Sequence, residues 1–132
     1  MENQQIKELI KKANSASEFS YSPYSNYKVG AALLTKSGKI FTGTNIENAS
    51  YPAGICAERV ALSKAVSEGE SEFETIVIFA KDEQNLPYPC GICRQSLSEF
   101  SPNMNIVVVN NENQYETHLL SELFTHSFTL KK

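Results

Sequence analysis

The three cysteines of this chain fall in two short segments that could together hold one metal ion. Cys56 opens the segment CAER, and Cys90 and Cys93 lie in PCGICRQ. On a helix, residues three apart share one face, and a helix N-terminus favours thiolates through its free N–H groups and positive dipole end. A structural zinc site takes four protein ligands, whereas a catalytic one takes three and leaves a position for water. Three cysteines therefore predict one zinc ion per chain in an open, catalytic site.

Two charged residues follow Cys56 closely enough to assist such a site. Glu58 falls in the first turn of the predicted helix, near enough to approach a water on the metal without binding the metal. This placement makes Glu58 a candidate proton shuttle. Arg59 lies on the same helical face as Cys56, and its guanidinium could offset the excess negative charge of three thiolates around Zn²⁺.

Simpler interpretations of these residues remain open at this point. Free cysteines are often small buried hydrophobic residues, and one CxxC motif alone is weak evidence for a metal site. A structural Cys₃His site could take His118 or His126 as its fourth ligand. Glu58 and Arg59 could be an ordinary solvated ion pair, although the sequence around them is apolar.

Composition narrows the class of protein. The chain has 132 residues, with 12 Lys and Arg against 15 Asp and Glu, which gives a net charge of -3 and argues against nucleic-acid binding. The early residues carry charge and lack the apolar core of a signal peptide, and no apolar run approaches the ~20 residues of a membrane helix. An odd number of thiols suits a reducing compartment. We expect one cytoplasmic domain over residues 1–132, with no nucleic-acid or membrane partner.

Hydrophobic spacing predicts the elements that position these residues. Period-3.6 patterns favour helices, and apolar or β-branched runs favour strands. The predicted helices cover residues 3–19, 55–68, 89–100 and 119–124, and the predicted strands cover 28–35, 39–44, 74–80, 106–109 and 114–117. A two-residue turn at Ser37-Gly38 should join the first two strands, and Pro89 should occupy the first turn of its helix.

This order of elements predicts an α/β fold. We expect a three-layer α/β/α sandwich with a mixed sheet of about five strands. Both cysteine segments are predicted to begin helices that follow strands. They should therefore deliver their side chains to the same rim of the sheet.

Taken together, these segments resemble the small homotetrameric, zinc-dependent cytidine deaminases of pyrimidine salvage. The resemblance runs from Tyr21 to Phe128 and preserves the family's order of motifs. The matching segments are PYS at 23–25, VGAALL at 29–34, NIENA at 45–49, YP at 51–52, GICAER at 54–59 and PCG at 89–91. The three-cysteine site with a non-ligand glutamate belongs to this recognised pattern.

The resemblance assigns a role to each matched residue. It makes Cys56, Cys90 and Cys93 the zinc ligands, Glu58 the proton shuttle and Arg59 the residue that balances sulfur charge. It makes Asn45 and Glu47 the readers of the ribose, which agrees with their spacing, because residues two apart on an extended segment point the same way. The backbone N–H of Ala57 would bind the carbonyl of the base.

Three aromatic residues complete the implied site. Tyr27 stands where the family usually has Phe beside the pyrimidine. Tyr51 and Phe128 would reach the pocket of a neighbouring subunit in a homotetramer with shared active sites. The C-terminal match is weaker, because Thr125 replaces the family's proline.

The implied reaction is hydrolytic deamination of cytidine and 2′-deoxycytidine to uridine and 2′-deoxyuridine, with release of ammonia. A deaminase for a cytosine-containing antibiotic is the nearest alternative, and it would be favoured by loss of the sugar-reading segment. A polynucleotide-editing deaminase would need a basic and aromatic surface for the strand. A zinc-stabilised binding module would need no glutamate beside an open metal position.

Overall fold

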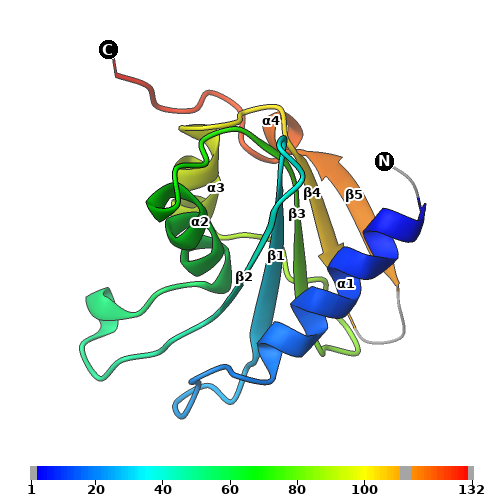
Figure 1. Ribbon diagram of the computed structural model, residues 1–132. Coiled ribbons are helices and arrows are strands. Elements are labelled where there is room, and N and C mark those ends of the chain that lie inside the picture. The colour runs from blue at the N-terminus through cyan, green and yellow to red at the C-terminus, as the bar shows by residue number, and fades with distance from the viewer. Residues whose placement is uncertain (1–2, 111–113, 131–132) are drawn as a thin grey trace.

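The structure is a computed structural model that describes residues 3–110 and 114–130. Its helices are α1 (Asn3–Ser17), the 3₁₀ helix η1 (Tyr51–Ala53), α2 (Ala57–Ser67), α3 (Gly91–Ser98) and α4 (Leu120–Leu123). Its strands are β1 (Val29–Thr35), β2 (Ile40–Thr44), β3 (Phe73–Ala80), β4 (Asn105–Val109) and β5 (Tyr115–Leu119). Figure 1 shows these elements in colour along the chain.

The strands form one mixed sheet in the order β2-β1-β3-β4-β5. Among the described strands, β3 and β4 pair in parallel, and the other neighbouring pairs are antiparallel. The connection from β3 to its parallel neighbour passes through α3, as a parallel pair requires a crossover. The predicted mixed, five-stranded sheet is confirmed.

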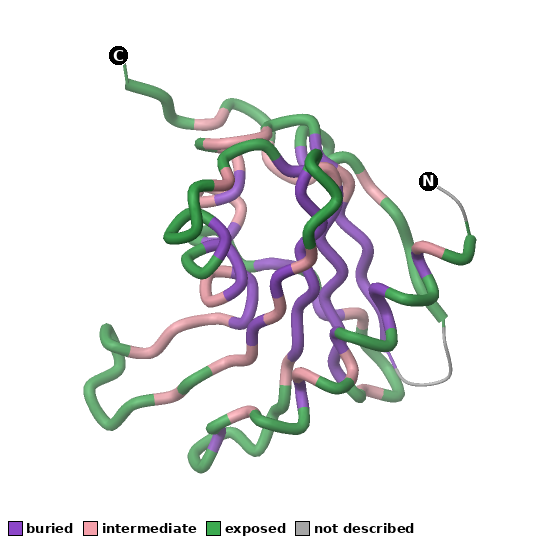
Figure 2. Tube along the Cα trace, in the orientation of Figure 1, coloured by how far each residue is buried: buried purple, intermediate pink, exposed green. Residues whose placement is uncertain are grey.

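Helices cover both faces of this sheet, and alternate strand residues supply each side of the core. Ala32 and Leu34 of β1 pack with α1 on one face, whereas Ala31 and Leu33 pack with α2 on the other. Figure 1 shows α1 on its own side and α2 with α3 on the opposite side, and Figure 2 shows the central strands as mostly buried. The predicted three-layer α/β/α architecture is confirmed.

Two glycines let the helices approach the strands closely. A Cβ at Gly43 of β2 would lie 2.5 Å from both the carbonyl oxygen of Ala57 and the amide nitrogen of Ala61, in the first turns of α2. A Cβ at Gly30 of β1 would lie 1.9 Å from the carbonyl oxygen of Ala13 in α1. The absent side chain at Gly43 thus sets where α2 begins over the sheet, and therefore where Cys56 stands.

Some local predictions were wrong, each for a hydrogen-bonding reason. Three residues, not two, separate Thr35 from Lys39, whose backbones are hydrogen-bonded across the hairpin. The Gly38 N–H donates to the Thr35 carbonyl to close the turn, and Gly38 then adopts a positive φ of 94° that leads into β2. Pro89 lies outside α3, which begins at Gly91 with Cys90 as its N-cap. Leu119 ends β5 instead of starting the last helix.

Among the described residues, no helix has both the length and the apolar character to cross a bilayer.

Candidate metal centre and active site

The three thiols meet at the N-termini of α2 and α3, which contact each other on one face of the sheet. Cys56 is the N-cap of α2, Cys90 is the N-cap of α3, and Cys93 lies in the first turn of α3. The Sγ atoms of Cys56 and Cys90 are 3.8 Å apart, and those of Cys90 and Cys93 are 3.6 Å apart. The predicted convergence of both cysteine segments is confirmed.

These distances fit one zinc ion. With Zn–S bonds of about 2.3 Å, two sulfurs of a tetrahedral zinc lie about 3.8 Å apart. Within residues 3–110 and 114–130, the group of potential ligands that gathers closely enough for a metal contains these three cysteines and no histidine. His118 instead lies on β5, with Nε2 3.0 Å from the Glu116 carboxylate. Three protein ligands leave one tetrahedral position open, as in catalytic zinc sites.

The surroundings of Cys56 favour its thiolate form, whereas the hydrogen bond to Cys56 and burial raise the pKa of Cys93. Hydrogen bonding from Cys93, helped by Arg59, lowers the pKa of the Cys56 thiol to about 5 although partial burial opposes this. The Nη2 atom of Arg59 lies 3.9 Å from the Cys56 sulfur. Among the described residues, Arg59 Nε is buried without a hydrogen-bond partner. Burial opposes the charged guanidinium, but hydrogen bonds to Cys56 and Cys93 outweigh burial and raise the pKa of Arg59. Arg59 therefore lies beside the Cys56 sulfur, as its spacing from Cys56 on the helix predicts.

Glu58 is a buried carboxyl group beside the thiols. It lies in the first turn of α2 and is 5% exposed. Burial raises the pKa of Glu58 to about 7, and the nearby Cys56 charge acts in the same direction. Tyr27 is 37% exposed, and the pKa of its hydroxyl is raised first by partial burial and then by the charges of Asp82 and Glu58. A carboxyl with such a pKa can both accept and return a proton near neutral pH.

Asn45 and Glu47 follow β2 on an extended segment that lies against the loop of residues 20–27. The Tyr21 N–H donates to the Asn45 carbonyl at 3.0 Å, and the Glu47 N–H donates to the Tyr21 carbonyl at 2.8 Å. Ile46 forms a second bridge, to Ile55 just before Cys56. Residues 45–47 are thus hydrogen-bonded on one side to the 20–27 loop and on the other to Ile55, next to Cys56.

The remaining predicted aromatic residues are exposed in this single chain. Tyr51 lies in η1 and is 81% exposed, and Phe128 is 67% exposed. The side-chain amide of Gln95 donates to the Phe128 carbonyl at 2.9 Å, which holds the C-terminal segment near α3. Neither aromatic ring is buried by its own chain, so both present apolar surface to the solvent.

Sequence reasoning missed several residues that shape the site. Arg94 donates to the carbonyl of Pro89 at 2.8 Å and to that of Leu123 at 2.6 Å, which ties the Cys90 loop to the C-terminal segment. Ser20 and Ser25 donate to the side chains of Asn45 and Glu47. Ser25 belongs to the recognised PYS motif, but its hydroxyl contact spans 22 positions of sequence and has no local signal.

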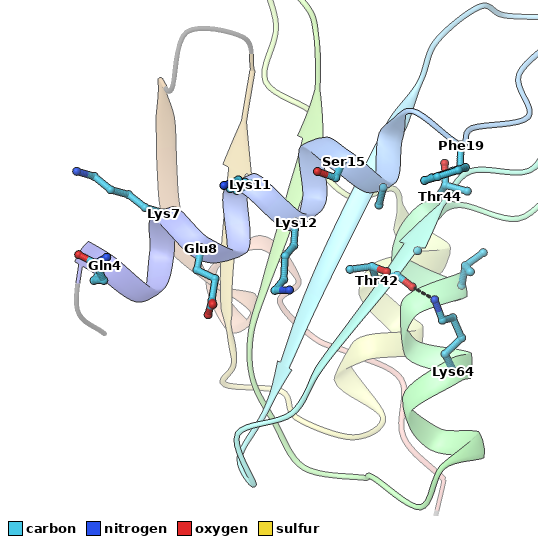
Figure 3. Close-up of a pocket in the computed structure, with 13 residues that line it drawn as sticks. Gln4, Lys7, Glu8, Lys11, Lys12, Ser15, Phe19, Thr42, Thr44 and Lys64 are labelled. Atoms are coloured by element: carbon cyan, nitrogen blue, oxygen red, sulfur yellow. Dashed lines mark hydrogen bonds between the residues drawn. The ribbon is translucent and has the colours of Figure 1, made fainter.

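A large groove lies elsewhere, along the open edge of β2 between α1 and α2. This groove of about 900 Å³ is lined by Lys7, Lys11 and Lys12 of α1 and by Lys64 of α2 (Figure 3). The antiparallel register turns the Thr42 carbonyl towards this edge, where it accepts a hydrogen bond from Lys64 at 2.5 Å. Lysines along an edge strand discourage pairing with other chains. The lining of the groove includes none of the thiols.

The sequence of this chain is similar to those of known deaminases. A family model described as the cytidine and deoxycytidylate deaminase zinc-binding region matches residues 3–110. The probable cytidine deaminase of Dictyostelium discoideum is 40% identical over 135 residues, covering 100% of this chain and 92% of that protein. The cytidine deaminase of Halalkalibacterium halodurans is 44% identical over 122 residues, covering 92% of each.

A solved structure gives the same result. The crystal structure of cytidine deaminase from Burkholderia pseudomallei matches with a TM-score of 0.88 at 39% identity, covering 97% of this chain and 100% of that one. The region matched by the family model contains all three thiols and Glu58. Since both sequence and fold agree over nearly the whole chain, this protein belongs to the zinc-binding family of cytidine and deoxycytidylate deaminases.

Proposed function

We propose that this protein is a cytidine deaminase of pyrimidine salvage that hydrolyses cytidine and 2′-deoxycytidine to the corresponding uridines and ammonia. One observation carries the proposal: a buried glutamate stands beside three converging thiols whose spacing fits an open zinc site. Cys56, Cys90 and Cys93 would hold the zinc ion, which when bound would lower the pKa of a water to about 7 and so supply a nucleophile at neutral pH.

Glu58 moves the protons of the reaction. As the water oxygen forms its bond to C4 of the pyrimidine, the Glu58 carboxylate accepts the water proton and passes it to ring N3. Glu58 then takes the proton of the C4 hydroxyl and gives it to the exocyclic amine, so that the C4–N bond breaks, the C4=O bond of the uridine forms and ammonia leaves. Burial of Glu58 supports this role, because it brings the neutral and ionised forms of the carboxyl close in energy.

The backbone and loop residues select the substrate. In this proposal the N–H of Ala57, next to Cys56 at the start of α2, binds the base carbonyl, and Tyr27 contacts the pyrimidine; the influence of the Glu58 charge on the pKa of Tyr27 supports the second role. Asn45 and Glu47 offer an amide and a carboxylate to sugar hydroxyls. The Glu47 charge would repel a 5′-phosphate nearby, which favours a free nucleoside over a nucleotide.

The alternatives have less support. The segment proposed to bind the sugar, which contains Asn45 and Glu47, is present in this chain. Its presence disfavours an enzyme restricted to a cytosine-containing antibiotic. The net charge of -3 disfavours a polynucleotide substrate. A glutamate buried beside an open metal position has no purpose in a binding module.

We also propose a cytoplasmic homotetramer with shared active sites. The exposed rings of Tyr51 and Phe128 support this assembly, because a single chain of this size offers little depth to enclose a nucleoside. Cover from a neighbour would exclude water and strengthen the polar contacts in the pocket.

A substrate comparison tests the proposed function. Purified protein is incubated separately with cytidine, 2′-deoxycytidine, cytosine base and CMP, and loss of the cytosine absorbance is followed. We expect rapid loss with both nucleosides and slow loss with the base and the nucleotide. Equal rates on CMP would refute the role of Glu47 in selecting the sugar, and no turnover of either nucleoside would refute the function itself.

A further inference from the structure

The 20–27 loop does more than lie beside the polar segment, because it supplies hydrogen bonds to both side chains that face the sugar position. Figure 1 shows this loop and the long connection that follows β2 extending from the same end of the sheet. The isolated bridge between Tyr21 and Ile46 joins them. The loop is therefore fixed against the backbone of residues 45–47 before any ligand is present.

The carboxylate of Glu47 receives three hydrogen bonds from this loop. Its Oε1 accepts from the backbone N–H of Tyr24 at 3.0 Å and from that of Ser25 at 3.2 Å. Its Oε2 accepts from the hydroxyl of Ser25. An exposed glutamate otherwise retains several rotamers, so an additional bond to the second oxygen restrains rotation of the carboxylate. The Ser25 hydroxyl is also the main cause that lowers the pKa of Glu47.

The amide of Asn45 is restrained in a complementary way. Its Oδ1 accepts from the Ser20 hydroxyl at 2.5 Å and from the Val29 N–H at 3.0 Å, and its Nδ2 donates to the Tyr27 carbonyl at 2.8 Å. Both lone pairs of Oδ1 are used, which leaves one Nδ2 hydrogen for a ligand. Asn45 can thus only donate to a ligand, while Glu47 can only accept. A hydroxyl, which both donates and accepts, fits this pair.

We propose that Ser25 is a positioning residue that sets the affinity for the sugar by holding the Glu47 carboxylate in its ligand-binding orientation. This inference rests on the proposed nucleoside function. Ser25 contacts Glu47 and not the reacting atoms, so it acts on substrate binding rather than on proton transfer. Its effect therefore requires a sugar hydroxyl in the substrate.

The test compares the deamination kinetics of Ser25→Ala and of the parent protein on two substrates. One is cytidine, and the other is 2′,3′-dideoxycytidine, which lacks the 2′- and 3′-hydroxyls of the ribose ring. Losing one hydrogen bond to a carboxylate should raise KM for cytidine by about tenfold, with kcat and zinc content unchanged. KM for 2′,3′-dideoxycytidine should stay at the parent value, because that substrate makes no bond to Glu47.

Two further variants serve as controls. Ser25→Thr keeps the hydroxyl and should retain a KM near that of the parent. Ser37→Ala removes a bond of the same kind, from the Ser37 hydroxyl to Glu70 at 2.9 Å, at the opposite end of β1. Ser37→Ala should leave KM unchanged on both substrates.

Two results would overturn the proposal. An equal rise in KM on both substrates would show that Ser25 only maintains the loop, and an unchanged KM on cytidine would show that the backbone N–H groups alone hold Glu47. If Ser25→Ala fails to fold, Ser25→Cys, a weaker donor of similar size, decides the same comparison. A parent that does not deaminate cytidine would refute the proposed function instead, and this is visible before any variant is made.

Discussion

Glu58 is a charged residue type in a buried environment that disfavours its charge. A glutamate that is 5% exposed loses hydration, and burial raises its pKa to about 7. Burying a carboxyl group in this way lowers the stability of the fold, and a catalytic role beside the thiol centre accounts for why the cost is tolerated. The carboxyl stands beside the metal position without belonging to the group of potential ligands.

Glu58→Gln should therefore separate chemistry from binding. The amide keeps the size of the side chain but cannot accept and return a proton, so the deamination rate should fall by about 10² to 10⁴. Zinc content and thermal stability should remain at least at the parent level. Metal analysis and a thermal melt on the same sample provide the control, and a variant that retains most of its activity would remove Glu58 from the mechanism.

Among individual residues, the sequence predicted those that can be recognised from their type and their spacing to near neighbours in the chain. Cys90 and Cys93 share one helical turn, and Glu58 follows Cys56 closely, so the three-thiol cluster and its glutamate could be recognised without the fold. The contacts of Ser20 and Ser25 could not, since each depends on how the 20–27 loop lies against a segment about twenty positions away. The ties from Arg94 and Gln95 to the C-terminal segment escaped prediction for the same reason.

At the level of helices and strands, the packing of α2 against β2 determines the position of Cys56, the N-cap of α2. The helix lies so close to the strand that any side chain at Gly43 would meet the backbone of Ala57 and Ala61. Backbone atoms cannot rotate out of the way as a flexible side chain can. The N-terminus of α2, and the thiol at its N-cap, must shift if that space is filled.

Gly43→Ala should consequently lower the free energy of unfolding by about 1–3 kcal/mol, the usual effect of overpacking a core. It should also weaken zinc retention, because Cys56 moves relative to Cys90 and Cys93. Gly91→Ala is the matched control for stability, as a Cβ there meets nothing within 4 Å. Equal melting temperatures for the two variants would show that α2 tolerates displacement.

Element types were predictable because hydrophobic periodicity is a local property. The apolar run of β3 and the stripe of α1 identify a central strand and an amphipathic helix directly. Their ends were harder, since a helix boundary depends on which group caps it. Cys90, and not Pro89, takes the N-cap of α3, and a glycine with positive φ lengthens the first hairpin loop to three residues.

On the scale of the whole molecule, the site is open in a single chain. Tyr51 and Phe128 expose most of their aromatic surface, and the Gln95 bond holds the Phe128 backbone without burying its ring. Large exposed aromatic rings near a functional site commonly mark a contact surface. The proposed homotetramer of closed symmetry would place these rings over the pockets of neighbouring subunits.

Mixing two impaired variants tests this sharing. Glu58→Gln protein lacks the proton shuttle, and Phe128→Ala protein lacks the covering ring. When subunits exchange, some hybrid pockets combine Glu58 of one chain with Phe128 of another, so tight nucleoside binding and turnover should recover. Unmixed variants carried through the same exchange are the control, and no gain on mixing would mean that each pocket belongs to one chain.

The most direct test of the account is to remove and restore zinc while following uridine and ammonia. The parent protein should contain about one zinc per chain, as its three-thiol cluster predicts, and should form uridine and ammonia in equal amounts from cytidine. A chelator should abolish both products, and stoichiometric zinc should restore them. Full activity in protein shown to be free of metal, or zinc-loaded protein that leaves cytidine unchanged, would contradict the account.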